Sequence, residues 1–181
     1  IMRFDNTFYI SDLLGILTLI TILVGGLFAL YKWNKSMRIK RADYIKSLID
    51  INNKEMILET FSLFDYDIKW YDNSFHGSEK EQKIDFTLTY FDYICYLNKM
   101  GVFDKKTFLL FKYQVDAIVK NRQVHDYFYN LYHYSKSKGI EFSYHYLIEY
   151  AIKHDCINKE LFDKTSYRKY KMYHKYLNWI D

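Results

Sequence analysis

The stretch LLGILTLITILVGGLFALY, from Leu13 to Tyr31, decides the fold of this chain because none of its nineteen residues carries a charge. As an α-helix it would be about 28 Å long, which is close to the thickness of the hydrocarbon core of a bilayer. It has no polar face, so a soluble bundle would have to surround it on all sides. The sequence therefore predicts a transmembrane helix at 13–31.

The basic residues of the chain gather directly after this apolar stretch. Residues 1–41 contain six Lys or Arg and two Asp, which accounts for the whole net charge of +4. The basic cluster that follows the span consists of Lys32, Lys35, Arg38, Lys40 and Arg41. Since loops rich in Lys and Arg stay in the cytoplasm, we expect residues 1–12 to be extracytoplasmic and the C-terminal part to be cytoplasmic.

The expected transmembrane helix has one face of mostly small side chains. At about 100° per residue, six residues fall within one sector of about 100°. They are Gly15, Thr18, Ile22, Gly25, Gly26 and Ala29. Small residues let helices approach closely in lipid, so this packing face predicts a homo-oligomer and is a candidate pore face. Gly and Thr are also common in membrane helices in general, and that alternative stays open.

The remainder of the chain reads as a helical bundle. The whole sequence has only six Gly and no Pro, with twenty Tyr and fourteen Phe, which argues against a turn-rich β fold. The sequence predicts an all-α protein with a basic juxtamembrane amphipathic helix at 32–52 and a helical bundle at 53–181. Its stripe Ile84, Leu88, Phe91 and Cys95 has helical spacing and is expected in the core.

Several helix boundaries follow from capping residues. We expect Asn53 to cap a helix at 54–64, and Ser78 with Glu81 to form a capping box for a helix that Gly101 ends. Asp104 is the expected cap of the next helix, and after Asn121 a further helix is expected that Gly139 ends. A polar and aromatic loop is expected at 65–77, a short helix at 142–154 and a last helix from 158 toward 179.

Motifs of familiar enzyme classes are not found in the sequence. There is no Gly-rich phosphate loop, no nucleophile elbow and no His-Glu-x-x-His pair, and the six His are scattered. Cys95 and Cys156 are too isolated for a zinc site or a disulfide framework. We therefore expect no cofactor and no metal.

One pair of residues near the C-terminus is a candidate catalytic pair. Arg168 and His174, with five residues between them, resemble the Arg-x(4–6)-His pattern of HEPN domains, which are small helical bundles and often metal-independent ribonucleases. The resemblance implies a divergent HEPN-like domain in which His would transfer a proton and Arg would steady a phosphate. Lys169 departs from the polar residue usual after this Arg. Six helical positions turn by about 600°, which separates the two side chains, so we expect a structural role and no RNA cleavage.

The order of elements carries a wider resemblance. An N-terminal span, a basic helix, the segment FHGSEKEQKIDFTLTYFDYICYL at 75–97 and a Tyr-rich C-terminus resemble the small membrane accessory proteins of type VI-B CRISPR systems. The resemblance implies a protein of the bacterial inner membrane that forms a pore-like oligomer. It would contact membrane lipid and support an RNA-guided, RNA-targeting effector in antiviral defence.

Two alternatives remain from the residues alone. The first is a membrane-tethered HEPN-type ribonuclease, and the second is a membrane-anchored scaffold that binds another protein. RNA binding would rest on the C-terminal segment, where Lys and Arg alternate with Tyr. Aromatic residues at every third position fit the buried stripe of a helix better.

Overall fold

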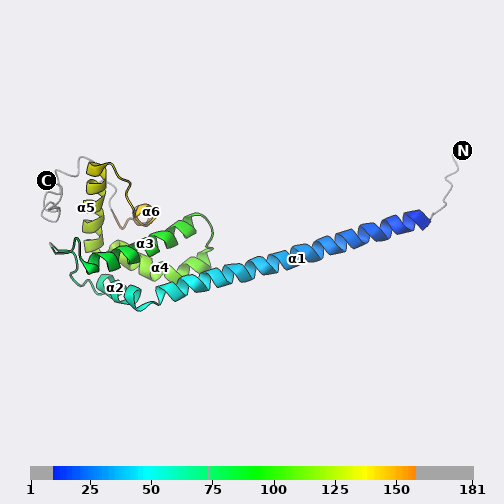
Figure 1. The fold of residues 1–181 in the computed structure, drawn as a ribbon, viewed down its shortest axis with the longest axis horizontal. Coiled ribbons are helices and arrows are strands. Elements are labelled where there is room, and N and C mark those ends of the chain that lie inside the picture. The colour runs from blue at the N-terminus through cyan, green and yellow to red at the C-terminus, as the bar shows by residue number, and fades with distance from the viewer. Residues whose placement is uncertain (1–9, 73, 158–181) are drawn as a thin grey trace. The chain divides into compact units, whose positions relative to one another are not determined.

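The computed structural model describes residues 10–72 and 74–157, and this part of the chain is all-α without a strand. It divides into two units, residues 1–52 and 53–181. The six helices of the described part are α1 (Ile10–Asn52), α2 (Glu55–Asp65), α3 (Glu79–Lys99), α4 (Lys105–Lys120), α5 (Arg122–Lys138) and α6 (His145–Lys153), drawn in Figure 1. The predicted all-α class is confirmed for these residues.

Helix α1 is one uninterrupted helix of 43 residues, which corresponds to about 64 Å. The predicted transmembrane segment 13–31 therefore runs without a break into the segment 32–52. The hydroxyl groups of Thr18 and Thr21 donate to the carbonyls of Leu14 and Leu17, at 2.8 and 2.9 Å. These bonds keep the polar side chains satisfied within the helix, as hydrocarbon surroundings require. By length and composition, α1 is able to cross a membrane.

The N-terminal caps of the bundle helices agree with the sequence except at α2. The Ser78 hydroxyl accepts from the Glu81 amide at 3.1 Å, and the Asp104 carboxylate accepts from the Thr107 amide at 2.8 Å. Asn121 caps α5 through its side-chain oxygen. The expectation for Asn53 is wrong: α2 begins one residue later, its N-cap is Lys54, and no side chain caps it.

Two glycines end helices as expected. Gly101 and Gly139 have φ values of +69° and +67°, which favour a residue without a Cβ. The amide of Val102 donates to the carbonyl of Leu97 at 3.0 Å, and the amide of Ile140 to that of Ser135 at 2.9 Å. Each bond satisfies a carbonyl in the last turn of its helix, as in a Schellman motif.

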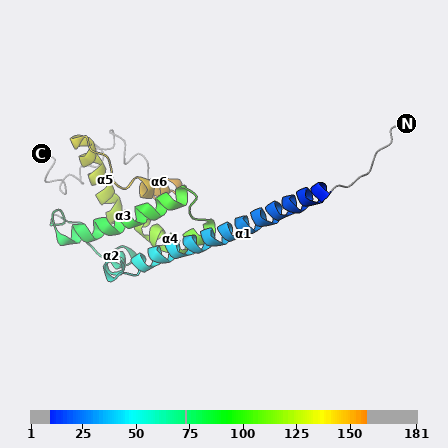
Figure 2. The same cartoon turned by 45° about the vertical axis from the view of Figure 1, so that its right-hand side comes forward.

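Helix α3 lies at the centre of the second unit. Helices α2, α4 and α6 pack against it, and α5 packs against α4 (Figure 1, Figure 2). The predicted stripe of α3 is buried: Ile84, Leu88 and Phe91 are fully enclosed and Cys95 nearly so. Helix α4 turns its own apolar stripe inward in the same way. The core prediction for α3 is confirmed.

The connection between α2 and α3 is part of the core, which the sequence analysis did not predict. Trp70, Tyr71 and Phe75 are at most 3 % exposed, although they belong to the expected loop at 65–77. Their rings meet Tyr127 of α5 at centroid distances of 5.3 to 6.0 Å. The loop is therefore an irregular segment that inserts aromatic side chains between helices.

The start of α6 also differs from the prediction. The short helix expected from 142 begins at His145, because Tyr144, just before it, is buried in a non-helical conformation. The Tyr144 ring stacks on Phe128 of α5 at 5.2 Å. The expected last helix from 158 lies outside the described residues.

Candidate functional site

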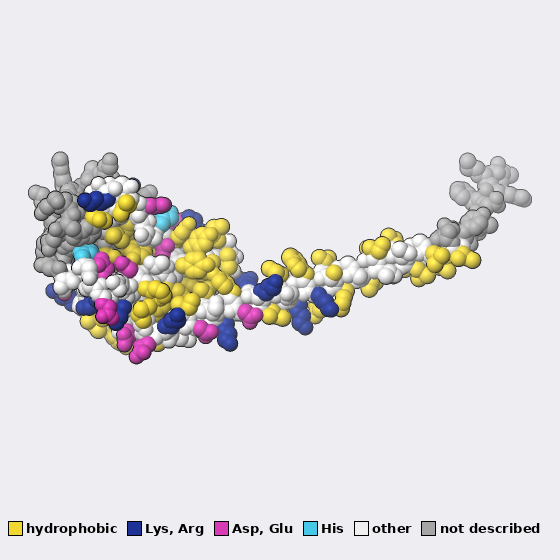
Figure 3. Space-filling view, in the orientation of Figure 1, with side chains coloured by type: hydrophobic (Ala, Val, Ile, Leu, Met, Phe, Trp, Pro, Cys, Tyr) yellow, Lys and Arg dark blue, Asp and Glu magenta, His cyan; other side chains and the backbone are white. Residues whose placement is uncertain are grey.

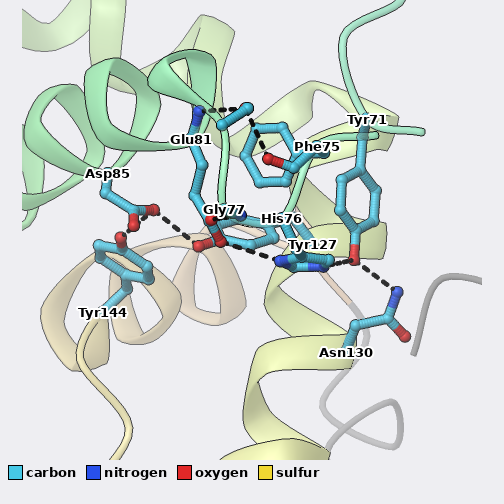
Figure 4. A network of polar contacts seen from close by, with 10 residues as sticks. Tyr71, Phe75, His76, Gly77, Glu81, Asp85, Tyr127, Asn130 and Tyr144 are labelled. Carbon is cyan, nitrogen blue, oxygen red and sulfur yellow. Dashed lines mark hydrogen bonds and ion pairs between the residues drawn. The ribbon is translucent and has the colours of Figure 1, made fainter. Parts of the chain in front are cut away.

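A polar network lies where the connection between α2 and α3 meets the first turn of α3. Ser78 starts this helix, which places Glu81 in its first turn with the carboxylate directed back along the chain. One oxygen, Oε2, accepts from the amide of Gly77 at 2.5 Å, and Oε1 lies 2.9 Å from Nδ1 of His76 (Figure 4). Because a carboxylate accepts, the imidazole donates from Nδ1.

The network continues from His76 into the core. With Nδ1 carrying the proton, Nε2 of His76 accepts from the Tyr71 hydroxyl at 3.4 Å. The Asn130 amide in turn donates to the Tyr71 oxygen at 2.9 Å. Asn130 is fully buried, and its side-chain oxygen has no hydrogen-bond partner among the described residues. The chain of contacts therefore links α3 to the middle of α5 (Figure 4).

Asp85, one turn further along α3, forms the second part of the network. Its Oδ1 accepts from the hydroxyls of Tyr127 at 2.6 Å and Tyr144 at 2.9 Å. Burial raises the pKa of the Asp85 carboxyl, and the two hydroxyl donors oppose that shift. Burial likewise raises the pKa of both tyrosines, so each hydroxyl keeps its proton and donates. Asp85 is thus a shared acceptor that ties α5 and the start of α6 to α3.

A His–carboxylate pair is the usual unit of general acid–base catalysis, but its surroundings here point to structure. The side chains of His76 and Glu81 are only 21 % and 22 % exposed. The His76 ring packs against Tyr71 and Phe75 at 5.8 and 5.4 Å. Within the described residues, the hydrogen-bonding groups of this pair face one another, the Tyr71 hydroxyl and the backbone of Gly77. We conclude that the network positions the segment 66–78.

Gln123 at the start of α5 holds the same segment from the other side. Its side-chain oxygen accepts from the amides of Trp70 and Tyr71 at 2.8 and 3.1 Å. Its amide nitrogen donates to the carbonyl of Ile68 at 3.0 Å. A single side chain therefore supplies the backbone bonds that an irregular buried segment would otherwise lack.

The predicted membrane residues lie on α1 as the sequence placed them. The packing-face residues from Gly15 to Ala29 are all exposed, and a Cβ added at Gly15, Gly25 or Gly26 would meet no atom within 4 Å. The basic cluster Lys32–Arg41 follows the apolar segment along the same helix, as blue after yellow side chains in Figure 3. The side chains of both groups are exposed along α1.

The other predictions about the site have mixed outcomes. Arg168 and His174 lie outside the described residues, so their expected separation and structural role stay predictions. Among the described residues no three His, Cys, Asp or Glu side chains gather as a metal site. The two thiols are unpaired, and burial raises the pKa of Cys95. The sequence reasoning missed the pair His76 and Glu81, although the Ser78–Glu81 capping signal pointed to its location.

Comparison of the chain with family models, with curated proteins and with solved structures finds no match in any of the three. The class is therefore defined by the fold itself. The described part is an all-α chain in which one long apolar helix precedes a bundle of five shorter helices.

Proposed function

We propose that the chain is a single-pass membrane protein that self-associates through α1 and perturbs the membrane that it spans. The observation that carries this proposal is the exposure of α1: no residue of its most apolar 18-residue window is buried within the chain. Soluble monomers rarely expose contiguous apolar surface of this extent. Lipid and other copies of α1 are the surroundings that would cover it.

Self-association is supported by the packing face. Gly25 and Gly26 leave the backbone of α1 uncovered, with nothing of the chain near either position. Helices in lipid associate where small residues allow close van der Waals contact. The basic cluster after the span orients the bundle toward the cytoplasm under the positive-inside rule.

The biological setting of the proposal rests on the resemblance to accessory proteins of type VI-B CRISPR systems. In that setting the oligomer is pore-like, sits in a bacterial inner membrane and strengthens antiviral immunity by an RNA-guided effector. No cofactor enters the proposed action, because the work is done by helix packing within the bilayer.

The test is leakage of a fluorescent dye from liposomes that contain the purified protein. We expect leakage that rises steeply with protein density, together with cross-linked species larger than a dimer. Gly25→Leu should reduce both, because a branched side chain blocks close approach. The control is Val24→Leu, which introduces the same side chain on the far side of the helix.

Two results would contradict the proposal. The first is wild-type protein that inserts into liposomes and stays monomeric without leakage. The second is equal leakage by Gly25→Leu and wild type at equal insertion, which would show that the packing face plays no part in assembly.

A further inference from the structure

A cavity of about 580 Å³ lies between the C-terminal half of α3, the N-terminal half of α4 and helix α6. Its floor is formed by the buried side chains of Cys95, Phe108 and Tyr150. The half-buried ring of Tyr146 forms one wall. Its size falls in the range typical of small-molecule sites, and it belongs entirely to the second unit.

The aromatic side chains of the cavity are held in place by neighbours. The Tyr150 hydroxyl donates to Oδ1 of Asp116 at 2.8 Å, and the Phe108 ring lies 5.6 Å from the Tyr150 ring. The Tyr146 ring packs against Tyr96 at 4.9 Å. Flat, fixed aromatic surfaces of this kind accept another planar ring by stacking.

The rim of the cavity is basic, although residues 42–181 sum to zero net charge. Four lysines line it, Lys99, Lys105, Lys112 and Lys153, against one carboxylate, Glu149. Lys99 pairs with Glu149 at 2.6 Å and Lys112 pairs with Asp116. Lys105 and Lys153 are exposed and have no ion pair within the part of the chain that the structure describes.

We propose that this cavity binds a nucleoside phosphate, with the base against the aromatic floor and wall and the phosphate among the lysines. Lysine ammonium groups bind phosphate as point charges, and aromatic rings stack on any base. The floor gives this site an apolar surface that inorganic phosphate or a sugar phosphate would not use. The inference concerns the bundle alone and does not depend on the proposed action of α1.

Glu149 gives the proposal a prediction of opposite sign to that of the lysines. Among the described residues, its carboxylate is the only acidic side chain that lines the cavity. It forms an ion pair with Lys99. Glu149→Gln would remove a repulsive charge and release an ammonium group toward the ligand. A purely structural set of ion pairs would not give tighter anion binding after this change.

The experiment is a calorimetric titration of the full chain in uncharged detergent with AMP, GMP, ribose 5-phosphate and inorganic phosphate. We expect saturable binding of the nucleotides, at least about fivefold tighter than that of ribose 5-phosphate, as expected for one stacked base. Lys105→Gln and Lys153→Gln should each weaken nucleotide binding about threefold or more, and Glu149→Gln should strengthen it by a similar factor. The matched control is Lys69→Gln, an exposed lysine outside the cavity, which should leave affinity unchanged.

The aromatic wall is tested separately. Tyr146→Ala should bring AMP affinity down toward that of ribose 5-phosphate, whereas Tyr146→Phe should retain the difference. The thermal midpoint of each variant shows that it is folded. The proposal is overturned if nucleotides and ribose 5-phosphate bind equally, if folded charge variants bind like wild type, or if only an RNA oligonucleotide binds and no mononucleotide competes with it.

Discussion

The carboxylate of Glu81 bridges His76 and the backbone of Gly77, with Nδ1 of His76 at 2.9 Å from Oε1 and the Gly77 amide at 2.5 Å from Oε2. In the usual capping box the acidic residue returns to the amide of the N-cap itself, here Ser78. That amide instead donates to the carbonyl of Phe75 at 3.2 Å. The carboxylate thus reaches one residue further back and fastens the end of the buried segment to α3.

Replacement of Glu81 tests this bridge. Glu81→Ala should lower the free energy of unfolding by about 1–2 kcal/mol, since it removes an acceptor from two donors at a helix start. Urea unfolding of the detergent-solubilised chain, followed by near-ultraviolet circular dichroism, measures the change. Glu79→Ala is the control, because Glu79 forms an exposed pair with Lys83 and its loss should cost less than about 0.5 kcal/mol. Equal effects of both changes would contradict the role given to Glu81.

Gln123 should contribute more to the free energy of unfolding than its half-buried position indicates. Gln123→Ala removes three hydrogen bonds to the segment 68–71 and leaves partly buried backbone groups unpaired. We expect the free energy of unfolding to fall by about 2–3 kcal/mol. Faster hydrogen exchange at the Trp70 and Tyr71 amides should accompany it.

Two variants separate the bonds that Gln123 makes. Gln123→Glu keeps the acceptor for Trp70 and Tyr71 but loses the donor to Ile68, so its effect should lie between those of wild type and Gln123→Ala. Arg122→Ala, at the neighbouring exposed position, should leave exchange at both amides unchanged. If Gln123→Ala also left exchange at both amides unchanged, the Gln123 side chain would not stabilise the segment 68–71.

The parts of the fold that follow from local rules were predictable from the sequence. The caps at Ser78 and Asp104 and the stripe of α3 depend on residues three or four positions apart. The backbone amide of Trp70 bonds to Gln123, which is 53 positions away, and no local pattern encodes that contact. The one missed cap, Lys54, has no capping side chain to signal it.

The cavity likewise combines features set by local sequence with contacts between residues far apart in the chain. Phe108 lies in the helix that the Asp104 cap predicts, and its side chain is buried. That it shares a cavity with Tyr146 and Lys153 follows only once α6 packs beside α3 and α4. Tertiary packing of helices distant in sequence therefore creates a basic rim, although the formal charges of residues 42–181 cancel in the sequence.

His125 should make the stability of the bundle depend on pH. Burial lowers the pKa of its imidazole from the ordinary value of 6.5, while the Val119 carbonyl and Asp126 oppose the shift. The unfolded chain therefore takes up the proton at a higher pH than the folded chain. The free energy of unfolding should fall as the pH drops below about 6.5 and continue to fall until the folded form is also protonated.

The measurement is urea unfolding at several pH values between 5 and 8. His125→Gln should flatten the dependence, because the site then carries no titrating group. His145→Gln is the control, since the His145 side chain is 71 % exposed, and it should retain the wild-type profile. An unchanged slope in His125→Gln would assign the pH dependence to another group.

Asp85 provides the last prediction, which separates its charge from its hydrogen bonds. Asp85→Asn retains a side-chain oxygen for the hydroxyls of Tyr127 and Tyr144, whereas Asp85→Ala leaves two buried donors without an acceptor. We expect Asp85→Ala to lower the free energy of unfolding by about 2–4 kcal/mol at neutral pH. Asp85→Asn should be as stable as wild type or more stable there, because it avoids burying a charge.

The pH dependence of the free energy of unfolding shows whether burial stabilises or destabilises the charged form of Asp85. Because burial raises the folded pKa above the ordinary 3.8, the folded state favours the protonated carboxyl. The resulting stabilisation is complete below 3.8 and is lost as the pH rises through the folded pKa. The advantage of Asp85→Asn over wild type should therefore grow from pH 4 to pH 7 in urea unfolding. Asp65→Asn is the control. The Asp65 carboxylate accepts from Tyr113 at the exposed surface, so this variant measures the effect of the same substitution without burial. An advantage of Asp85→Asn that shrank with rising pH would show that the carboxylate is stabilised, not strained, in this site.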